Sequence, residues 1–220
     1  MINIDIGYKC MGVTSMLIDL HIHESTYSLD SKTDIYQIIK DAKEKGLDAV
    51  CITDHESNSI KEKAKAVSEE LNYPVFVGME FLTNQGDIVA IGLDEVPKEK
   101  LDAQEFIDLV HANGGVCISA HPYRNNNRGL EDNLKVVKGL DAIEGYNGST
   151  TDVGNQKAVD VAKELGIQYI GSSDSHYPGV VGRYATVLPF KVLTEEELIK
   201  AIKTNKCKAA KYEKGKYIIL

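Results

Sequence analysis

The chain has 220 residues, and its 25 Lys and Arg against 33 Asp and Glu give a formal net charge of −8. A chain of this length can bury about 70–75% of its surface, and a hydrophobic fraction of 43% excludes disorder, collagen and coiled coil. The acidic balance argues against non-specific binding to nucleic acid or to an anionic membrane surface. We expect a cytoplasmic protein with no membrane partner, because the sequence shows no apolar run near the roughly 20 residues of a membrane helix, no signal-peptide pattern and no CxxC pair.

Short β-branched runs alternate with amphipathic segments along the chain. The runs predict strands at Met16–Leu20, Ala49–Thr53, Val75–Gly78, Ile88–Gly92, Val116–Ala120, Ala142–Gly145, Gln168–Gly171 and Ala185–Leu188. The amphipathic segments predict helices at Thr33–Lys45, Ser57–Leu71, Asp102–Ala112, Glu131–Lys138, Asp152–Leu165 and Thr194–Thr204. Such alternation implies parallel strands with right-handed crossovers, either in an open doubly wound sheet or in a closed barrel. Composition does not choose between the two.

Polar residues that can bind metal follow almost every predicted strand. Five of the six histidines lie there (His21, His23, His55, His121 and His176), together with the acidic residues Glu80, Glu144 and Asp174. In a barrel, loops from distant parts of the chain meet at the carboxyl ends of the strands. An open sheet concentrates its site at one switch point instead. This distribution therefore favours the barrel.

The spacing of these residues is typical of metal ligation. His21 and His23 are two residues apart as the chain leaves a strand, so both imidazoles project to one side, and Asp174 and His176 repeat the spacing. One such pair alone is more often a surface feature, but the joint occurrence of several favours metal. A mixed set of imidazoles and carboxylates suits Zn, Mn or Fe. The candidate ligands are His21, His23, Asp30, His55, Glu80, His121, Asp174 and His176.

Eight candidates exceed the needs of one tetrahedral ion. They suit a cluster of two or three divalent transition-metal ions, with Glu80 as a bridging ligand. Such a cluster clamps an oxyanion and lowers the pKa of bound water, as hydrolysis at a phosphorus centre requires.

Other polar residues receive supporting roles. His111 lies near the carboxyl end of a predicted helix and is interpreted as structural. Asp19 and Asp54 precede ligands and are interpreted as pointing away from the ligand face, where they either brace the site or satisfy local hydrogen bonds. Glu144 is expected to support the site without contacting metal.

Seven segments occur in an order that resembles one known family: DLHIH, SLDS, ITDH, GMEF, SAHP, AIEGYN and GSSDSH. Over Leu17–Leu188 the chain is similar to the PHP family, named for polymerase and histidinol phosphatase. The resemblance implies a single distorted (β/α)7 TIM-like barrel in residues 16–220, with its metal site at the carboxyl ends of the strands. It also implies hydrolysis of phosphate esters of a small substrate. Met1–Ser15 would then be a dispensable extension.

The resemblance also implies a ligand set for each ion. One ion would bind His21, His23, Glu80 and Asp174, a second would share Glu80 and bind His121, and a third would bind Asp30, His55 and His176. Glu80, Asp174 and His176 are the expected catalytic residues. A water or hydroxide that bridges the ions is the expected nucleophile.

The chain departs from the family pattern after GMEF. Relatives often carry a His there in a GHI-like step, whereas this chain has Gly86-Asp87-Ile88. Asp87 is either a replacement metal ligand, whose harder oxygen would favour Mn or Mg over Zn, or part of a hairpin turn. The stretch from His23 to Asp30 is also one residue longer than usual.

Cationic residues are expected to hold the substrate phosphate. Arg124, Arg128 and Arg183 follow ligand-bearing strand ends, and the planar guanidinium matches phosphate bidentately. The alternative for each is a solvated loop arginine.

Three functions stay open on the sequence alone. The leading one is hydrolysis of phosphomonoesters or phosphodiesters. A second is that of an amidohydrolase, also a barrel with HxH after its first strand, although amidohydrolases usually lack the TDH step and end with a lone Asp. The third is a non-catalytic metal-binding or regulatory domain, which only a measurement of turnover separates from the first.

Overall fold

The computed structural model describes residues 15–220. Its strands are β1 (Met16–Ile22), β2 (Ala49–Ile52), β3 (Val75–Val77), β4 (Met79–Leu82), β5 (Asp87–Ile91), β6 (Val116–Ser119), β7 (Ala142–Asn147), β8 (Tyr169–Ser172), β9 (Tyr184–Leu188), β10 (Lys208–Glu213) and β11 (Lys216–Ile219). Its helices are α1 (Ile35–Lys45), α2 (Lys61–Leu71), α3 (Ala103–Ala112), α4 (Asp152–Leu165) and α5 (Glu195–Lys203), and Glu131–Lys135 is a 3₁₀ helix. None of the helices in this range combines the length and apolar character of a membrane span.

Local capping explains where the helices begin and end. The Thr194 hydroxyl accepts a hydrogen bond from the Glu197 N–H at 3.3 Å, and the Asp102 N–H donates to the Glu105 carboxylate at 3.0 Å. At its carboxyl end, helix α1 stops at Gly46, whose φ of 80° is the left-handed conformation that glycine adopts readily.

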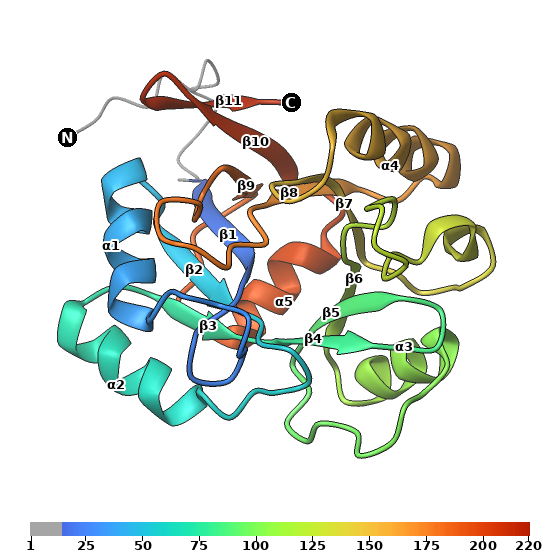
Figure 1. The fold of residues 1–220 in the computed structure, drawn as a ribbon, viewed down its shortest axis with the longest axis horizontal. Helices are drawn as coiled ribbons and strands as arrows, with labels where there is room; N and C mark the ends of the chain where they lie inside the picture. Colours follow the sequence, from blue (N-terminus) through green and yellow to red (C-terminus); the bar gives the residue numbers. More distant parts are fainter. Residues whose placement is uncertain (1–14) are drawn as a thin grey trace.

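The strands form two mixed sheets (Figure 1). One has the order β11-β10-β9-β1-β2-β3, and the other has the order β4-β5-β6-β7-β8. β1, β2 and β3 run parallel, with α1 and α2 between them, and β6, β7 and β8 also run parallel. β4, β5 and β6 pair antiparallel, as do β1, β9, β10 and β11. The parallel strands bring several carboxyl ends to the same side of the molecule.

The predicted (β/α)7 TIM-like barrel is therefore wrong. Within residues 15–220, no hydrogen-bonded ladder joins β3 to β4 or β8 to β9, so the sheets do not close. Between β3 and β4 the chain leaves one sheet for the other at Gly78, where a Cβ atom would lie 2.5 Å from the Ala90 carbonyl oxygen. β4 then returns directly to β5 without a helix, and a direct return makes the pair antiparallel.

Helix α5 closes the space between the two sheets, where Figure 1 shows it at the centre of the fold. Its Leu198 and Ile202 are buried in one cluster with Met16 of β1 and Val116 of β6. Met16 and Val116 are the first residues of their strands. Helix α5 thus covers the amino-terminal ends of the strands, opposite the ends that carry the histidines. α1 and α2 cover the outer face of β1–β3, and α3 and α4 cover the outer face of the other sheet.

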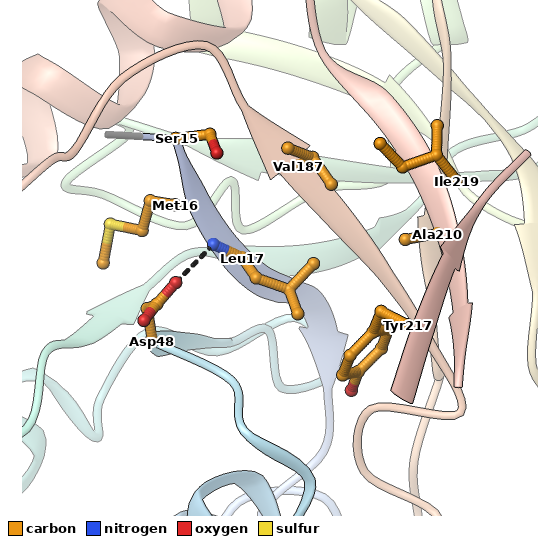
Figure 2. A pocket seen from close by; sticks show the side chains of 8 residues that line it. All are labelled: Ser15, Met16, Leu17, Asp48, Val187, Ala210, Tyr217 and Ile219. Atoms are coloured by element: carbon orange, nitrogen blue, oxygen red, sulfur yellow. Dashed lines mark hydrogen bonds between the residues drawn. The ribbon is translucent and has the colours of Figure 1, made fainter. Parts of the chain in front are cut away.

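A small, mostly apolar cavity lies where β9, β10 and β11 meet the start of β1 (Figure 2). It is lined by Ser15, Met16, Leu17, Asp48, Val187, Ala210, Tyr217 and Ile219. The Leu17 N–H donates to Asp48 Oδ2 at 2.8 Å beside it. The extension Met1–Ser15 lies, except for Ser15, outside the described residues, so its dispensability stays a prediction.

We predict that Leu198→Ala lowers the free energy of unfolding by about 2–5 kcal/mol, because it empties space in the cluster between the sheets. Leu193, which is 64% exposed just before α5, supplies the matched control, and Leu193→Ala should change stability by less than about 0.5 kcal/mol. Urea denaturation measures both. Equal effects of the two substitutions would show that α5 does not close the core.

Candidate metal centre

All eight predicted ligands lie in one cluster, although they come from separate segments. His21 is in β1, Glu80 is in β4, and the others follow β1, β2, β6 and β8 in the loops at the carboxyl ends of these strands. Their mutual contacts are short, as the distances below show. The sequence prediction that these residues converge is therefore matched by the geometry.

A β-bulge turns the two histidines of the HxH pair toward the site. Up to Leu20 the even-numbered residues of β1 pack between the sheets, so strict alternation would also bring Ile22 there. The register with β2 shifts between Asp19 and Ile22, and Ile22 packs in the outer cluster with α1 instead. His21 and His23 consequently face the site, whereas Asp19, two residues before His21, faces elsewhere.

Two of the predicted ligands have a left-handed backbone. His121 has a φ of 29° and Asp174 has a φ of 50°, and each lies two residues after the end of a strand. Hydrogen bonds fix both, because the His121 N–H donates to Glu144 Oε2 at 2.8 Å and the Asp174 N–H donates to the His21 carbonyl at 2.9 Å. Such conformations cost about 1–3 kcal/mol each and cluster at functional sites.

Glu80 occupies the centre of the cluster. Its Oε1 lies 2.9 Å from His121 Nε2 and 3.4 Å from His21 Nε2. Its Oε2 lies 2.8 Å from His55 Nδ1 and 3.5 Å from His23 Nε2. A buried carboxylate that faces four imidazoles with both oxygens has the geometry of a bridging ligand.

Three overlapping trios keep their ligand atoms within 4.8 Å of one another. They are His23–His55–His176, His21–Glu80–His121 and His21–His23–Asp174. His23 lies with His55 and His176 in one trio, at the place that the expected set for the third ion gives to Asp30. Asp30 is 58% exposed, and its Oδ2 lies 3.3 Å from His55 Nε2 and 3.4 Å from His176 Nε2.

Buried oxygen atoms orient the HxH pair. His21 Nδ1 lies 2.9 Å from Glu144 Oε1, and His23 Nδ1 lies 3.2 Å from the Ser28 hydroxyl. Ser28 donates its own hydrogen to Asp54 Oδ1 at 2.8 Å, so its oxygen accepts from His23. In the neutral form of both imidazoles the proton is thus held at Nδ1, and the lone pair is at Nε2.

These residues fit a bound cation. The two Nε2 atoms lie 3.0 Å apart, and two lone pairs at that distance need a proton or a metal ion between them. Asp174 Oδ1 is buried and makes no hydrogen bond, which is costly without a cation. Imidazoles with carboxylates are a donor set that suits Zn, Mn or Fe.

The charges within the cluster also call for a cation. Burial lowers the pKa of His21, but Glu144, Glu80 and Asp174 outweigh burial and raise that pKa well above its usual value. Burial lowers the pKa of His23 to about 4, so this imidazole stays neutral. Burial raises the pKa of Glu80, yet the charge of His21 and hydrogen bonds from the imidazoles hold that pKa well below its usual value. Ionised carboxylates are therefore buried here and need positive charge beside them.

A pocket with a volume of about 190 Å³ opens onto the cluster. It is lined by Asp30, His55, Glu80, Asp87, His121, Arg124, Asn126, Arg128, Asp174 and His176. Arg124 Nη1 donates to Asp174 Oδ2 at 2.7 Å, and Arg128 binds Asp87. The third predicted arginine, Arg183, is not part of this lining, and its Nη1 donates to the Gly148 carbonyl at 2.9 Å. Two of the three predicted arginines thus reach the pocket.

Asp87 is the first residue of β5 and not part of the turn before it. Its carboxylate is fully buried, and Oδ2 lies 3.7 Å from His121 Nε2. The turn consists of the preceding residues 83–86, where the Thr83 N–H donates to the Gly86 carbonyl at 3.1 Å. The hairpin-turn interpretation of Asp87 therefore does not hold, and its carboxylate faces the pocket.

The remaining acids brace the site. Asp19 accepts from the N–H groups of Ser173 and Gly182 at 2.9 and 2.8 Å, so it ties β1 to the loop that carries Asp174. Burial raises the pKa of Asp19 to about 6. His111 lies elsewhere and pairs with Asp141 at 2.9 Å.

Sequence analysis missed two supporting residues. One is Ser28, which links His23 to Asp54. The other is Asn147, whose Nδ2 donates to Glu144 Oε2 at 2.9 Å. Both stand in segments that the sequence already singled out, SLDS and AIEGYN, and a search for partners of the ligands could have found them there.

We predict that Glu144→Gln weakens Zn or Mn binding about 10- to 100-fold, because His21 loses the carboxylate that holds its Nδ1 proton. Competition with a chelator of known affinity measures the change. Glu164→Gln, at an exposed glutamate that pairs with Lys135, is the control and should bind metal as the wild type does. Equal affinity of the Glu144 variant and the control would contradict the supporting role.

Comparisons with known proteins place most of the chain in a family. Residues 19–149 match the PHP domain family, and residues 154–207 match the family of PHP-associated regions. An uncharacterized protein of Methanocaldococcus jannaschii is 32% identical over 161 residues, which span 68% of this chain and 94% of the relative. A second uncharacterized protein of that organism is 26% identical over 175 residues, spanning 76% of this chain and 68% of the relative.

Solved structures share the fold. A proposed metal-dependent phosphoesterase from Bifidobacterium adolescentis has a TM-score of 0.65 at 17% identity, over 88% of this chain and 98% of the other. The lesion-specific endonuclease PfuEndoQ from Pyrococcus furiosus has a TM-score of 0.68 at 20% identity, over 89% of this chain and 58% of the endonuclease. An amidohydrolase from Chromobacterium violaceum has a TM-score of 0.62 at 16% identity, over 90% of this chain and 98% of the amidohydrolase. At these identities the likeness shows the fold alone.

The family itself is shown by sequence. The PHP domain match covers more than half of the chain, and the first M. jannaschii protein is similar over nearly its whole length. The resemblance predicted from seven short segments is thereby confirmed. The chain belongs to the PHP domain family.

Proposed function

We propose that the protein hydrolyses phosphate esters of a small molecule, as a phosphomonoesterase or a phosphodiesterase. The observation that carries the proposal is a single pocket in which two arginines lie beside the cluster of imidazoles and carboxylates. Arg124 and Arg128 are partly exposed in this pocket. Their planar guanidinium groups match phosphate oxygens bidentately. A chain with a net charge of −8 needs such local positive charge to attract a phosphate.

Two or three divalent ions (Zn, Mn or Fe), when bound, would supply Lewis acidity and a water molecule of lowered pKa. In this proposal eight residues hold them: His21, His23, Asp30, His55, Glu80, His121, Asp174 and His176. The ions and the arginines together bind the phosphate of a small phosphorylated substrate.

Three of these residues are the proposed catalytic residues. Glu80 stays ionised because four imidazoles surround it, and Asp174 directs its unpaired Oδ1 toward the HxH pair. His176 Nδ1 lies 3.1 Å from the Asp174 carbonyl and donates its proton there, which leaves the Nε2 lone pair to face the cluster as a ligand atom. Arg124 contacts Asp174 and would orient the phosphate against this group.

The two alternatives account for less of the pocket. An amidohydrolase would use the same kind of metal cluster, and the C. violaceum protein of similar fold carries that name. A neutral amide, however, brings Arg124 and Arg128 no anionic group beyond the carboxylates of Asp174 and Asp87 that they already contact. A non-catalytic metal-binding domain would keep the ligands but turn nothing over.

A substrate panel separates the three functions. Phosphorylated metabolites, nucleotides and matched amides should be incubated with the protein in Mn and in Zn, and released phosphate, alcohol and amine should be measured. We expect release from phosphate esters only. Hydrolysis confined to amides would favour the amidohydrolase, and no turnover of any compound would favour the non-catalytic domain.

We predict that His23→Ala and Asp174→Ala each lower phosphoesterase turnover by at least about 10³-fold, because each removes a ligand at the centre of the cluster. Circular dichroism and thermal melting should show a folded protein for both variants. His111→Ala is the matched control, since this imidazole pairs with Asp141 outside the pocket, and it should keep its activity. Wild-type turnover in His23→Ala or Asp174→Ala would reject the proposed site.

A further inference from the structure

Asp87 stands where the chain departs from its family, and the geometry gives it a partner other than metal. Both oxygens of its buried carboxylate accept hydrogen bonds from one guanidinium. Arg128 Nε donates to Oδ2 at 2.7 Å, and Arg128 Nη2 donates to Oδ1 at 3.0 Å. Parallel hydrogen bonds of this kind are among the strongest between side chains and also fix the direction of the arginine.

The backbones of the two residues are joined as well. The Asp87 N–H donates to the Arg128 carbonyl at 2.6 Å. A Cβ atom on Gly86 would lie 2.5 Å from the carbonyl carbon of Gly129, so the two segments touch through their main chains. The loop that carries Arg128 therefore packs directly against the start of β5. These contacts fix the backbone of Arg128.

Arg128 keeps an unused edge that can meet a ligand. A guanidinium has five N–H donors, and Asp87 uses one at Nε and one at Nη2. Within residues 15–220, no hydrogen bond occupies the donors at Nη1 or the second donor at Nη2, and the side chain lines the pocket and is 37% exposed. Nη1 and Nη2 together form the end of the fork that matches two oxygens of a phosphate.

A metal ion at Asp87 would meet an electrostatic obstacle. Any cation bound to the Asp87 carboxylate would lie beside the guanidinium that already holds both oxygens. Two positive charges a few ångströms apart in a buried site repel each other strongly. Asp174, in contrast, gives only Oδ2 to Arg124 and keeps Oδ1 without a hydrogen bond, so one of its oxygens stays open to a cation.

We propose that Asp87 is a positioning residue that holds Arg128 in place for the substrate phosphate, and that it is not a metal ligand. This inference rests on the proposed phosphoesterase function, because it assigns a phosphate to the free edge of Arg128. Where relatives often have a histidine, this chain has Asp87. Asp87 forms an ion pair with Arg128, and Arg128 binds the substrate phosphate.

The test measures metal content and phosphate affinity separately. Wild type, Asp87→Ala, Asp87→Asn, Arg128→Ala and the double variant Asp87→Ala/Arg128→Ala are loaded with Mn. Elemental analysis then gives metal equivalents, and calorimetric titration gives the Kd for inorganic phosphate. Lys61→Ala and Asp94→Ala, at an exposed ion pair with a 2.8 Å contact, are the matched controls.

We expect equal metal content in all variants and a Kd for phosphate that rises about 10- to 100-fold in Arg128→Ala. Asp87→Ala should raise Kd about 3- to 30-fold, and the double variant should resemble Arg128→Ala, because the two residues act as one unit. Asp87→Asn retains one acceptor and should lie between wild type and Asp87→Ala, which also covers the case of an Asp87→Ala protein that does not fold.

Three results would overturn the inference. Loss of about one metal equivalent in Asp87→Asn or Asp87→Ala, with none in Arg128→Ala, would make Asp87 a ligand. Wild-type phosphate affinity in Arg128→Ala would overturn the positioning role alone, since the protein would still bind phosphate. A metal-loaded wild type that binds no phosphate would overturn the proposed function as well.

Discussion

The site depends on the burial of one ionised carboxylate among four imidazoles. Glu80 is 1% exposed, and its oxygens lie 2.8–3.5 Å from ring nitrogens of four histidines that come from three different segments. A buried charge is costly unless opposite charge and hydrogen bonds surround it. With Asp174 and Glu144 close by, the imidazoles alone do not balance the negative charge. We therefore interpret the surrounding structure as a framework that holds ligands for cations.

The unusual backbone features serve this framework. The bulge of β1 turns His21 and His23 inward, and the left-handed residues His121 and Asp174 redirect the chain as it leaves β6 and β8. Glu144 accepts the His121 N–H, and the His21 carbonyl accepts the Asp174 N–H, so hydrogen bonds hold both left-handed residues in place. At the opposite ends of the strands, α5 fills the space between the sheets with apolar side chains. The amino-terminal ends of the strands thus contribute mainly to stability, and the carboxyl ends carry the candidate metal ligands.

Much of this could be predicted from the sequence, because much of it is local. Strand β1 and helix α4 show their periodicity within a few residues, and the HxH pair is visible as such. The barrel was wrong because strand direction is not local. Nothing in the periodicity of residues 75–91 shows that the chain changes sheets at Gly78 and then reverses.

Partners distant in sequence escaped prediction for the same reason. Asp87 and Arg128 are 41 residues apart, so their bidentate pair appears only in the folded chain. The tie between Asp19 and Gly182 spans 163 residues and was likewise not visible. Residue type and spacing therefore identified the candidate ligands, whereas the partners that orient them required the three-dimensional structure.

The most direct test of the account is anomalous X-ray diffraction from crystals of the protein loaded with Mn or Zn, recorded on both sides of the absorption edge of the metal. The account predicts two or three anomalous peaks in the cluster, with at least one at about 2.0–2.6 Å from a carboxylate oxygen of Glu80. Crystals that contain the metal but show no anomalous peak within about 4 Å of Glu80 would contradict it.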